Sequence, residues 1–300
     1  MKPALSNLET EEARRCILCG NDHPEPDKRF RRLLALTGPY DVLRCRNCDV
    51  AWLSPRPTAG AYEQIYSYES YFDGESALED YTEVASSRNI HFIKRLERIA
   101  SMLGGTGNIR LLDIGAATGE FVHEAIKMGF DAEGIEISEG ARSQAKKLYG
   151  IDLLPGSLDD FTGETVYDVI HLNHVLEHLE SPGDTLDRCY SMLARDGLLV
   201  IEVPQQFNND LDRVKYLLGM KKPEFNIYSL HHIFFFSPKS VTTLVRKAGF
   251  EIESVATANP HRTPLQPLNM KNLLLRIFLG LSDRLHQGGN IIEVYGRKHV

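Results

Sequence analysis

The chain has 300 residues, of which 42% are hydrophobic, enough for one large α/β domain with its own core and a small appendage. The formal net charge of −7 gives no overall attraction to nucleic acid or to an anionic membrane. The N-terminal stretch lacks the apolar core of a signal peptide, and the run "NLLLRIFLGL" is too short to span a bilayer. We therefore expect a cytoplasmic protein without nucleic-acid partners or membrane insertion.

Residues 1–57 carry four of the five cysteines, in the sequences "CILCG" and "CRNCD". Two C-x-x-C pairs separated by a loop of 25 residues are typical of a structural tetrathiolate zinc site, and this segment is predicted to be a zinc ribbon. The remaining cysteine, Cys189, lies in a predicted helix and is expected to be a core residue. The predicted zinc ligands are Cys16, Cys19, Cys45 and Cys48.

Residues 58–107 are predicted to form a helical linker or cap, because apolar residues from Val84 to Leu103 recur at helical spacing before "GGTG". From residue 108 to 300, segments with strand and helix patterns alternate, which predicts an α/β fold with a parallel sheet covered on both faces. Residues 204–236 interrupt this alternation and are expected to form a lid or substrate-binding insertion. The expected strands are "IRLLDIG", "DAEGIEIS", "DLLPGSL", "YDVIHLN", "LLVIEVP", "EIESVAT" and "NIIEVYGRK", and the expected helices are "EFVHEAIKMG", "EGARSQAKKLYG", "PGDTLDRCYSMLARDG" and "SPKSVTTLVRKAGF".

The segment "LLDIGAATG" predicts a strand that ends in a glycine-rich turn and a helix, an arrangement that brings backbone close to a ligand. Gly115 and Gly119 permit the tight turn, but their G-x-x-x-G spacing, with Ala117 between them, is not that of a dinucleotide site. Asp113 would repel a pyrophosphate but accept a hydrogen bond from an ammonium group. Glu136 ends the next strand, where an acid can hold both ribose hydroxyls. An adenosine ligand with a cationic amino-acid tail fits these charges better than NAD.

These segments, with "YDVIHLNHVLEHLESP", "LARDGLLVIEVP" and "HHIFFFSPKSVTTLVRKAGFEIESV", follow one another as in the class I S-adenosylmethionine-dependent methyltransferases, which the chain resembles over residues 108–300. The resemblance implies a Rossmann-like sheet of seven strands with helices on both faces, and S-adenosyl-L-methionine as cofactor. The family commonly has glycine where this chain has Ala117. The cofactor-binding residues that the resemblance implies are Asp113, Gly115, Ala116, Gly119, Glu136, Ile137, Ser157, Leu158 and Asn173.

The segment "NHVLEHLESP" places His174, Glu177 and His178 directly after a buried strand, and on a helix these three would share one face. H-x-x-E-H also matches the inverted zinc-protease motif, but the surrounding alternation of strands and helices argues against a protease. The segment is similar to the E-x-x-E-H metal site of ubiquinone-pathway O-methyltransferases and small-RNA 2′-O-methyltransferases, with His174 in place of the first glutamate. That resemblance implies a catalytic divalent metal, with His232 as a further ligand.

Two alternatives stay open for these residues. In the first, His232 is a general base, by resemblance to sugar C-methyltransferases with zinc-binding N-termini. In those proteins an acid–histidine pair precedes an aromatic run, and in this chain His231 replaces the acid. In the second, Glu177 and His178 are a packing pair near the cofactor.

The expected function is methyl transfer to an oxygen of a small molecule, such as a sugar or a secondary-metabolite intermediate in a biosynthetic pathway. Tyr71, Tyr228 and His231 are expected to line the acceptor pocket. C- or N-methylation of a similar acceptor is the alternative reaction. A zinc-ribbon binding or scaffold protein with a degenerate cofactor pocket is the alternative of another class, although the intact turn and acids count against it.

Overall fold

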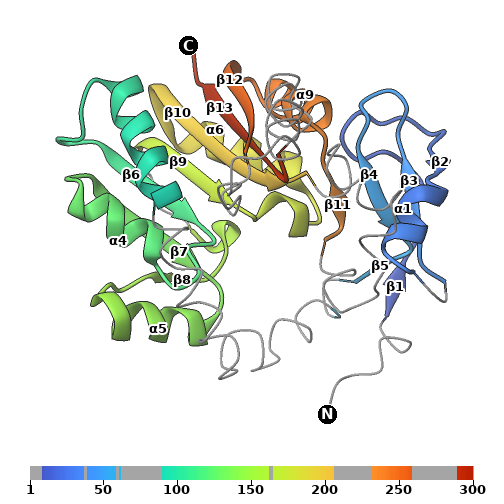
Figure 1. Ribbon diagram of the computed structural model, residues 1–300, viewed down its shortest axis with the longest axis horizontal. Coiled ribbons are helices and arrows are strands. Elements are labelled where there is room, and N and C mark those ends of the chain that lie inside the picture. The colour runs from blue at the N-terminus through green and yellow to red at the C-terminus, as the bar shows by residue number, and fades with distance from the viewer. Residues whose placement is uncertain are drawn as a thin grey trace, which may run out of the picture.

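The computed structural model describes residues 9–36, 39–58, 61, 90–161, 165–205, 232–258 and 289–299. They form a large sheet of seven strands with helices on both faces and, beside it, a smaller sheet of four strands (Figure 1). The expected α/β class is confirmed. Most of the predicted lid and of the helical linker lies outside the described residues, as do Tyr71, Tyr228 and His231.

The large sheet has the strand order β12-β13-β10-β9-β6-β7-β8. The chain enters at the centre with β6, runs outward to β8, and returns to β9 on the other side of β6. Strand β13 is antiparallel to both of its neighbours, and the other pairs are parallel. The strand order reverses between β6 and β9, and in open α/β sheets ligands bind at the carboxyl ends of the strands at such a reversal. The strands are β6 (Arg110–Ile114), β7 (Asp131–Glu136), β8 (Leu154–Pro155), β9 (Tyr167–Asn173), β10 (Leu193–Pro204), β12 (Glu251–Ala258) and β13 (Ile291–Arg297).

Alternate residues of the central strands enter two separate cores, because successive side chains of a strand point to opposite faces. Leu111 packs with the helix over residues 90–103 and with α4, whereas Leu112 packs on the face that α6 and α9 cover. Helix α5 packs against α4 and β7, and it begins at Ser138, whose side chain accepts a hydrogen bond from the backbone of Ala141. The helices are α4 (Glu120–Lys127), α5 (Glu139–Tyr149), α6 (Pro182–Met192) and α9 (Pro238–Lys247), with short 3-10 turns η2 (Leu158–Asp160) and η3 (Leu176–His178).

Helix α6 ends earlier than the sequence pattern predicts. The expected helix runs to Gly197, but α6 stops at Met192, and Leu193 already pairs with Tyr167 of β9. The apolar Leu193 side chain is buried in the core, and a register shift in β10 separates it from Leu198. Strand pairing and burial therefore outweigh the local helical pattern. No helix within the described ranges is long and apolar enough to cross a membrane.

The N-terminal part forms a ribbon around two equivalent turns. Gly20 N donates to Cys16 O over 2.7 Å, and Asp49 N donates to Cys45 O over 2.8 Å. Gly20 and Asp49 both have a left-handed backbone, with φ of 76° and 67°. The two C-x-x-C segments thus share one local geometry that turns their sulfurs inward. The elements of this part are β1 (Thr10–Glu11), β2 (Glu25–Pro26), α1 (Lys28–Leu33), β3 (Asp41–Arg44), β4 (Ala51–Ser54) and β5 (Arg56–Pro57).

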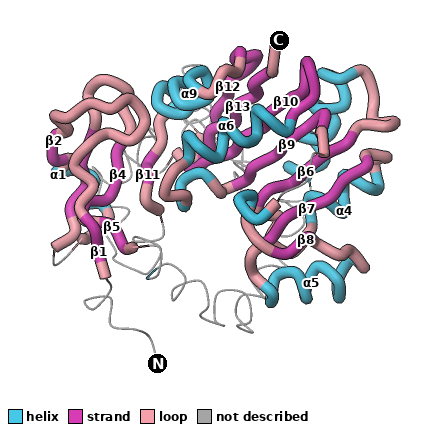
Figure 2. The backbone as a smooth tube through the Cα atoms, turned by 180° about the vertical axis from the view of Figure 1, so that it is seen from behind, coloured by secondary structure: helices cyan, strands magenta, loops and turns pink. Residues whose placement is uncertain are grey.

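The ribbon's sheet takes its fourth strand from the far end of the chain. Strand β11 (Phe234–Phe235) pairs antiparallel with β4, with Phe234 opposite Trp52 and Phe235 opposite Ala51. Figures 1 and 2 both show β11 beside β4, between the ribbon and the large sheet. Phe235 packs in the ribbon's small core, whereas Phe234 and Trp52 join the main core of the large domain. The boundary expected at residue 57 therefore does not enclose the whole ribbon sheet.

Candidate active site

The glycine-rich turn lies at the carboxyl end of β6, as expected. Gly115 and Gly119 have φ of 72° and 75°, a left-handed backbone that glycine adopts without strain. A Cβ on Gly115 would lie 2.6 Å from Cγ2 of Val175, so the turn contacts the loop that follows β9. Ala117 is also left-handed, with φ of 47°, so alanine here adopts a conformation that would cost glycine less. Side chains of Val175 and Ala145 are packed against the two glycines, so the turn has no room for larger residues there.

Glu136 ties this turn to the end of β7. Its two carboxylate oxygens accept hydrogen bonds from the backbone N–H groups of Ala117 and Ser138, each over 2.8 Å. Burial raises the pKa of Glu136, and the two backbone donors partly oppose that shift. The carboxylate is thus held in one orientation at the sheet edge. The other implied cofactor residues follow the strands β6 to β9: Ala116 in the turn, Ile137 after β7 with 66% of its surface exposed, Ser157 and Leu158 at η2, and Asn173 at the end of β9.

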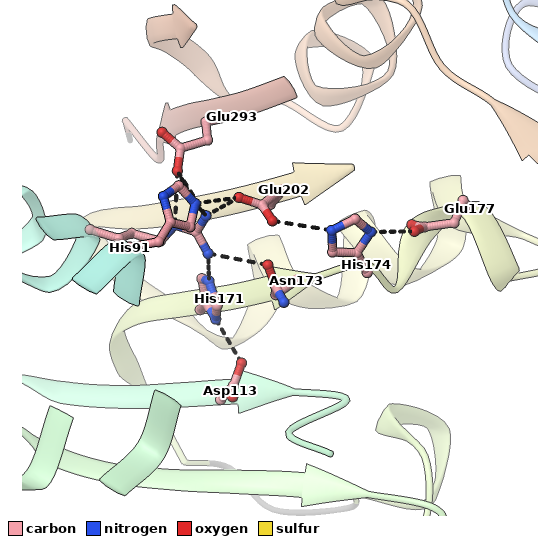
Figure 3. Close-up of polar contacts among 9 residues, drawn as sticks. His91, Asp113, His171, Asn173, His174, Glu177, Glu202 and Glu293 are labelled. Atoms are coloured by element: carbon pink, nitrogen blue, oxygen red, sulfur yellow. Dashed lines mark hydrogen bonds and ion pairs between the residues drawn. The ribbon is translucent and has the colours of Figure 1, made fainter. Parts of the chain in front are cut away.

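Arg95, from the helix over residues 90–103, is buried and belongs to a polar network. Figure 3 labels its partners Glu202 and Glu293. Its guanidinium donates to Glu202 of β10 and to Glu293 of β13, the latter over 2.8 and 3.0 Å. Burial alone would lower the pKa of Arg95, but the two carboxylates raise it, so the guanidinium is charged. His91, Glu202 and Glu293 also have the donor atoms of a metal site, but the charge of Arg95 already satisfies these acids.

The same guanidinium is connected to Asp113 of β6 through His171. Arg95 lies 3.0 Å from Nε2 of His171, and Nδ1 of His171 lies 2.7 Å from Oδ1 of Asp113. The His171 side chain is fully buried and stacks on Phe121 with ring centroids 3.8 Å apart. Burial lowers the pKa of His171 although Asp113 opposes the shift, so the ring is neutral. Asp113 is therefore connected to Arg95 by one imidazole.

His174 directly follows β9 and is held between two glutamates. Its Nδ1 lies 3.1 Å from Glu177 and its Nε2 lies 3.2 Å from Glu202 (Figure 3). Its backbone N–H also donates to the backbone oxygen of Glu202. The residue has a left-handed backbone with φ of 55°. Desolvation would lower the pKa of His174, but the hydrogen bonds and charges of the two glutamates raise it to about 10. Since both ring nitrogens already bind carboxylates, this geometry disfavours His174 as a metal ligand or a base.

The charge of His174 should make stability depend on alkaline pH. A histidine pKa raised above its unfolded value of about 6.5 contributes stability that is complete below that pH and is lost as pH rises through 10. The side chain is 40% exposed, so solvent screening reduces the contribution to about 1 kcal/mol. We expect the fall in unfolding temperature between pH 6 and pH 9.5 to be smaller in His174→Asn, because asparagine tolerates the left-handed backbone without the charge. Equal falls in both proteins, measured by calorimetry, would contradict this assignment.

Glu177, His178 and His232 form a second cluster on the far side of His174. Their donor atoms all lie within 4.8 Å of one another, and the rings of His178 and His232 meet edge to face at 4.8 Å. The segment is a 3-10 turn rather than a helix, so the three residues of "HVLEH" do not share a helical face. Glu177 is fully buried. Burial raises the pKa of Glu177, but the hydrogen bond from His174 and the charges of His178 and His232 lower it, so it is a carboxylate.

The four ribbon cysteines meet at one point. Sγ of Cys16 lies 3.5 Å from Sγ of Cys48, and Sγ of Cys19 lies 3.5 Å from Sγ of Cys45. All four sulfurs lie within 4.8 Å of one another. A tetrahedral zinc ion with bonds of about 2.3 Å separates its sulfurs by about 3.8 Å. The predicted ligand set therefore fits a closed structural zinc site, and Cys189 is a separate buried residue, as expected.

Comparison with known families identifies the larger domain. Residues 81–255, more than half of the chain, match the family model described as "Methyltransferase domain". The chain belongs to this methyltransferase family. The match includes the glycine turn, the "NHVLEH" segment and helix α9, so the methyltransferase family shares the part of the chain that carries the candidate site.

Curated relatives of this methyltransferase include ubiquinone biosynthesis O-methyltransferases. That of Caulobacter sp. (strain K31) is 28% identical over 170 residues, which are 54% of this chain and 62% of that protein. That of Bradyrhizobium diazoefficiens is 27% identical over 113 residues, which are 36% of this chain and 45% of that protein. The chain thus spans about half the length of these curated relatives.

Two solved structures have the same fold as this methyltransferase. The 1,6-didemethyltoxoflavin-N1-methyltransferase of Burkholderia thailandensis has a TM-score of 0.53 and 15% identity, with 92% of this chain and all of that chain covered. A methyltransferase of Thermotoga maritima, described as a possible histamine N-methyltransferase, has a TM-score of 0.51 and 19% identity, with 74% of this chain and 95% of that chain covered. The expected Rossmann-like methyltransferase fold is confirmed.

Asp113 and Glu136, the two acids expected to bind the cofactor, give a direct test of that expectation. We expect Asp113→Ala and Glu136→Ala each to weaken the binding of S-adenosylmethionine by roughly tenfold or more, because a hydrogen bond to a charged group contributes about 1.5–3 kcal/mol. Isothermal titration calorimetry measures both. Unchanged affinity in the two variants would remove the basis for placing the cofactor at this turn.

Sequence reasoning missed Arg95, His91, Glu202 and Glu293. The signal for the two acids is visible afterwards: each interrupts an otherwise apolar strand, in "LLVIEVP" and "NIIEVY". A carboxylate in a strand buried on both faces needs a cation nearby. Only the folded chain shows that Arg95 supplies this cation, 107 residues before Glu202 and 198 residues before Glu293.

Proposed function

We propose that this chain transfers a methyl group from S-adenosyl-L-methionine to a hydroxyl of a small molecule, such as a sugar or a secondary-metabolite intermediate. The observation that carries the proposal is the contact between the glycine-rich turn, where we expect the cofactor, and the loop after β9, which leads to the histidine cluster. The loop with His174 and Val175 touches the glycine turn of the cofactor site, so the cluster of Glu177, His178 and His232 follows directly beside it. The relatives named as O-methyltransferases support oxygen as the acceptor atom.

The residues of the site would divide the work as follows. Asp113 and Glu136 would bind the amino-acid and ribose parts of the cofactor, and Gly115 and Gly119 would let the backbone approach it. Bound S-adenosylmethionine supplies an electrophilic methyl group, so the protein needs to align the acceptor, exclude water and accept one proton.

His232 would accept the proton of the acceptor hydroxyl, with His178 packed against its ring. The buried carboxylate of Glu177 stabilises positive charge on this pair, because His178 Nε2 lies 3.8 Å from it. Glu177 would thus act as a buried acid that supports a histidine base, as the aspartate does in a Ser-His-Asp triad. Each role is carried by a side chain at the carboxyl edge of the sheet.

A divalent metal at the same cluster is the second candidate, and one observation favours it. Within the described part of the chain, Oε2 of Glu177 is buried without a hydrogen-bond partner. Two imidazoles and one carboxylate suit zinc with an open fourth position. A bound metal would lower the pKa of a hydroxyl that coordinates it. The donor atoms of the three residues lie within 4.8 Å of one another, so their spacing fits either role, and metal analysis separates this candidate from the base.

The test is a transfer assay with methyl-labelled S-adenosylmethionine against small-molecule extracts, followed by mass spectrometry of the labelled product. We expect label on a hydroxyl oxygen. A thermal-shift scan with S-adenosylhomocysteine separates the alternatives: a shift without any transferable label would indicate a binding protein instead. Metal analysis of Cys45→Ser, which removes the ribbon site, would reveal a second metal if the cluster of Glu177, His178 and His232 holds one.

A further inference from the structure

We propose that Arg95 and His171 are positioning residues that orient the Asp113 carboxylate toward the amino-acid part of the cofactor. The inference rests on the proposed cofactor site but not on the identity of the acceptor. It concerns a hydrogen-bonded chain of three side chains, Arg95 to His171 to Asp113, which runs from the helix over residues 90–103 across β9 to β6.

Arg95 determines which nitrogen of His171 carries the proton. A guanidinium has five N–H donors and no acceptor, so Nε2 of His171, 3.0 Å from Nη1 of Arg95, must accept. The proton of the neutral ring is then on Nδ1. That nitrogen lies 2.7 Å from Oδ1 of Asp113, and it donates to the carboxylate. A buried cation thereby selects the tautomer that can hold Asp113.

The ring that transmits this effect has little freedom to move. His171 is fully buried, and its imidazole stacks on Phe121 with an interplanar angle of 17°. Arg95 is fixed in turn, because Glu202 and Glu293 bind it and its side chain is only 1% exposed. Asp113 lies on β6 two residues before the turn begins at Gly115, and fixing one carboxylate oxygen sets the direction of the other.

The charge of Arg95 does not require His171. Glu202 and Glu293 already supply two negative charges, and Asn173 Oδ1 accepts a further hydrogen bond over 3.2 Å. Under a purely structural role, an apolar side chain of similar volume at position 171 would change stability and leave the cofactor site intact. Under the positioning role, the donor to Asp113 is the part that matters. The two roles therefore predict different effects on ligand affinity.

Three variants of His171 separate these roles. In His171→Asn the side-chain amide nitrogen takes the place of Nδ1 and keeps the donor to Asp113. In His171→Gln the amide reaches the place of Nε2 and keeps the contact with Arg95 alone. His171→Leu keeps only the apolar packing against Phe121. Thermal unfolding of the three variants shows how far each preserves the fold.

Calorimetry with two ligands gives the decisive readout. The first is S-adenosylmethionine, and the second is 5′-methylthioadenosine, which lacks the amino-acid part. We expect His171→Leu and His171→Gln each to bind S-adenosylmethionine roughly tenfold or more weakly than the parent. His171→Asn should stay within about threefold of the parent, and all three should bind 5′-methylthioadenosine within about threefold.

Equal losses for both ligands, or no loss for either, would overturn the positioning role. Nitrogen NMR of the His171 ring is an independent check, because a proton on Nε2 instead of Nδ1 would also refute it. A parent protein that binds neither ligand would instead contradict the proposed cofactor site, so the two failures are distinguishable.

Discussion

Turnover should fall by roughly 10²–10⁴-fold in His232→Ala, while the affinity for S-adenosylmethionine stays nearly unchanged. The reason is that His232 lies against His178 in the cluster beside Glu177, whereas Asp113 and Glu136, the acids expected to bind the cofactor, are on β6 and β7. Loss of the proton acceptor slows the chemical step and leaves the cofactor pocket intact. The measurement is kcat with the identified acceptor, together with calorimetric titration of the cofactor.

Two further proteins sharpen this result. His232→Gln keeps much of the side-chain volume but cannot accept a proton, so it should be as slow as the alanine variant. His299→Ala is the matched control. His299 contacts Asp196 near the opposite end of β10, so this variant should have the turnover of the parent. Added imidazole should partly restore the alanine variant. Full activity of His232→Ala would return this residue to a packing role.

Cys45→Ser should lose the ribbon zinc and unfold the N-terminal part. The ribbon's small core around Phe30 and Val42 is too limited to be stable without its metal. We expect about one zinc per chain in the parent and none at this site in the variant, measured by atomic spectrometry. Circular dichroism and protease digestion should report the loss of order in the ribbon.

Cys189→Ser is the control for this experiment. Cys189 is buried in α6 away from the sulfur cluster, so its replacement changes the core but should leave the zinc content unchanged. Reduced parent protein prepared without chelators that nevertheless contains no zinc would refute the ribbon site. Loss of zinc in both variants would instead indicate general unfolding.

The elements of the large domain were predictable because their signals are local. Alternation in "IRLLDIG" and helical spacing in "EFVHEAIKMG" each depend on a few neighbouring residues, and both elements form where expected. The glycine-rich turn was predictable for the same reason, since Gly115 and Gly119 stand within one short segment.

The interactions that connect these elements were not predictable from the chain alone. Arg95 and Glu293 are separated by 198 residues, and β11 and β4 by about 180, so no local pattern indicates either contact. The role of His174 depends in the same way on Glu202, which belongs to another strand. The sequence showed which groups stand at the edge of the sheet, but only folding shows which of them neutralise one another.

Strand β11 has a consequence for how this protein could be divided or recombined. A fragment that starts after residue 57 would lack β4, so β11 (Phe234–Phe235) would become an unpaired strand edge. It would also expose the part of the main core that Trp52 packs against. Open edges and exposed aromatic side chains favour self-association. The ribbon is therefore not an exchangeable module: a chimera that swaps it between relatives should stay monodisperse only if residues 232–236 are exchanged with it.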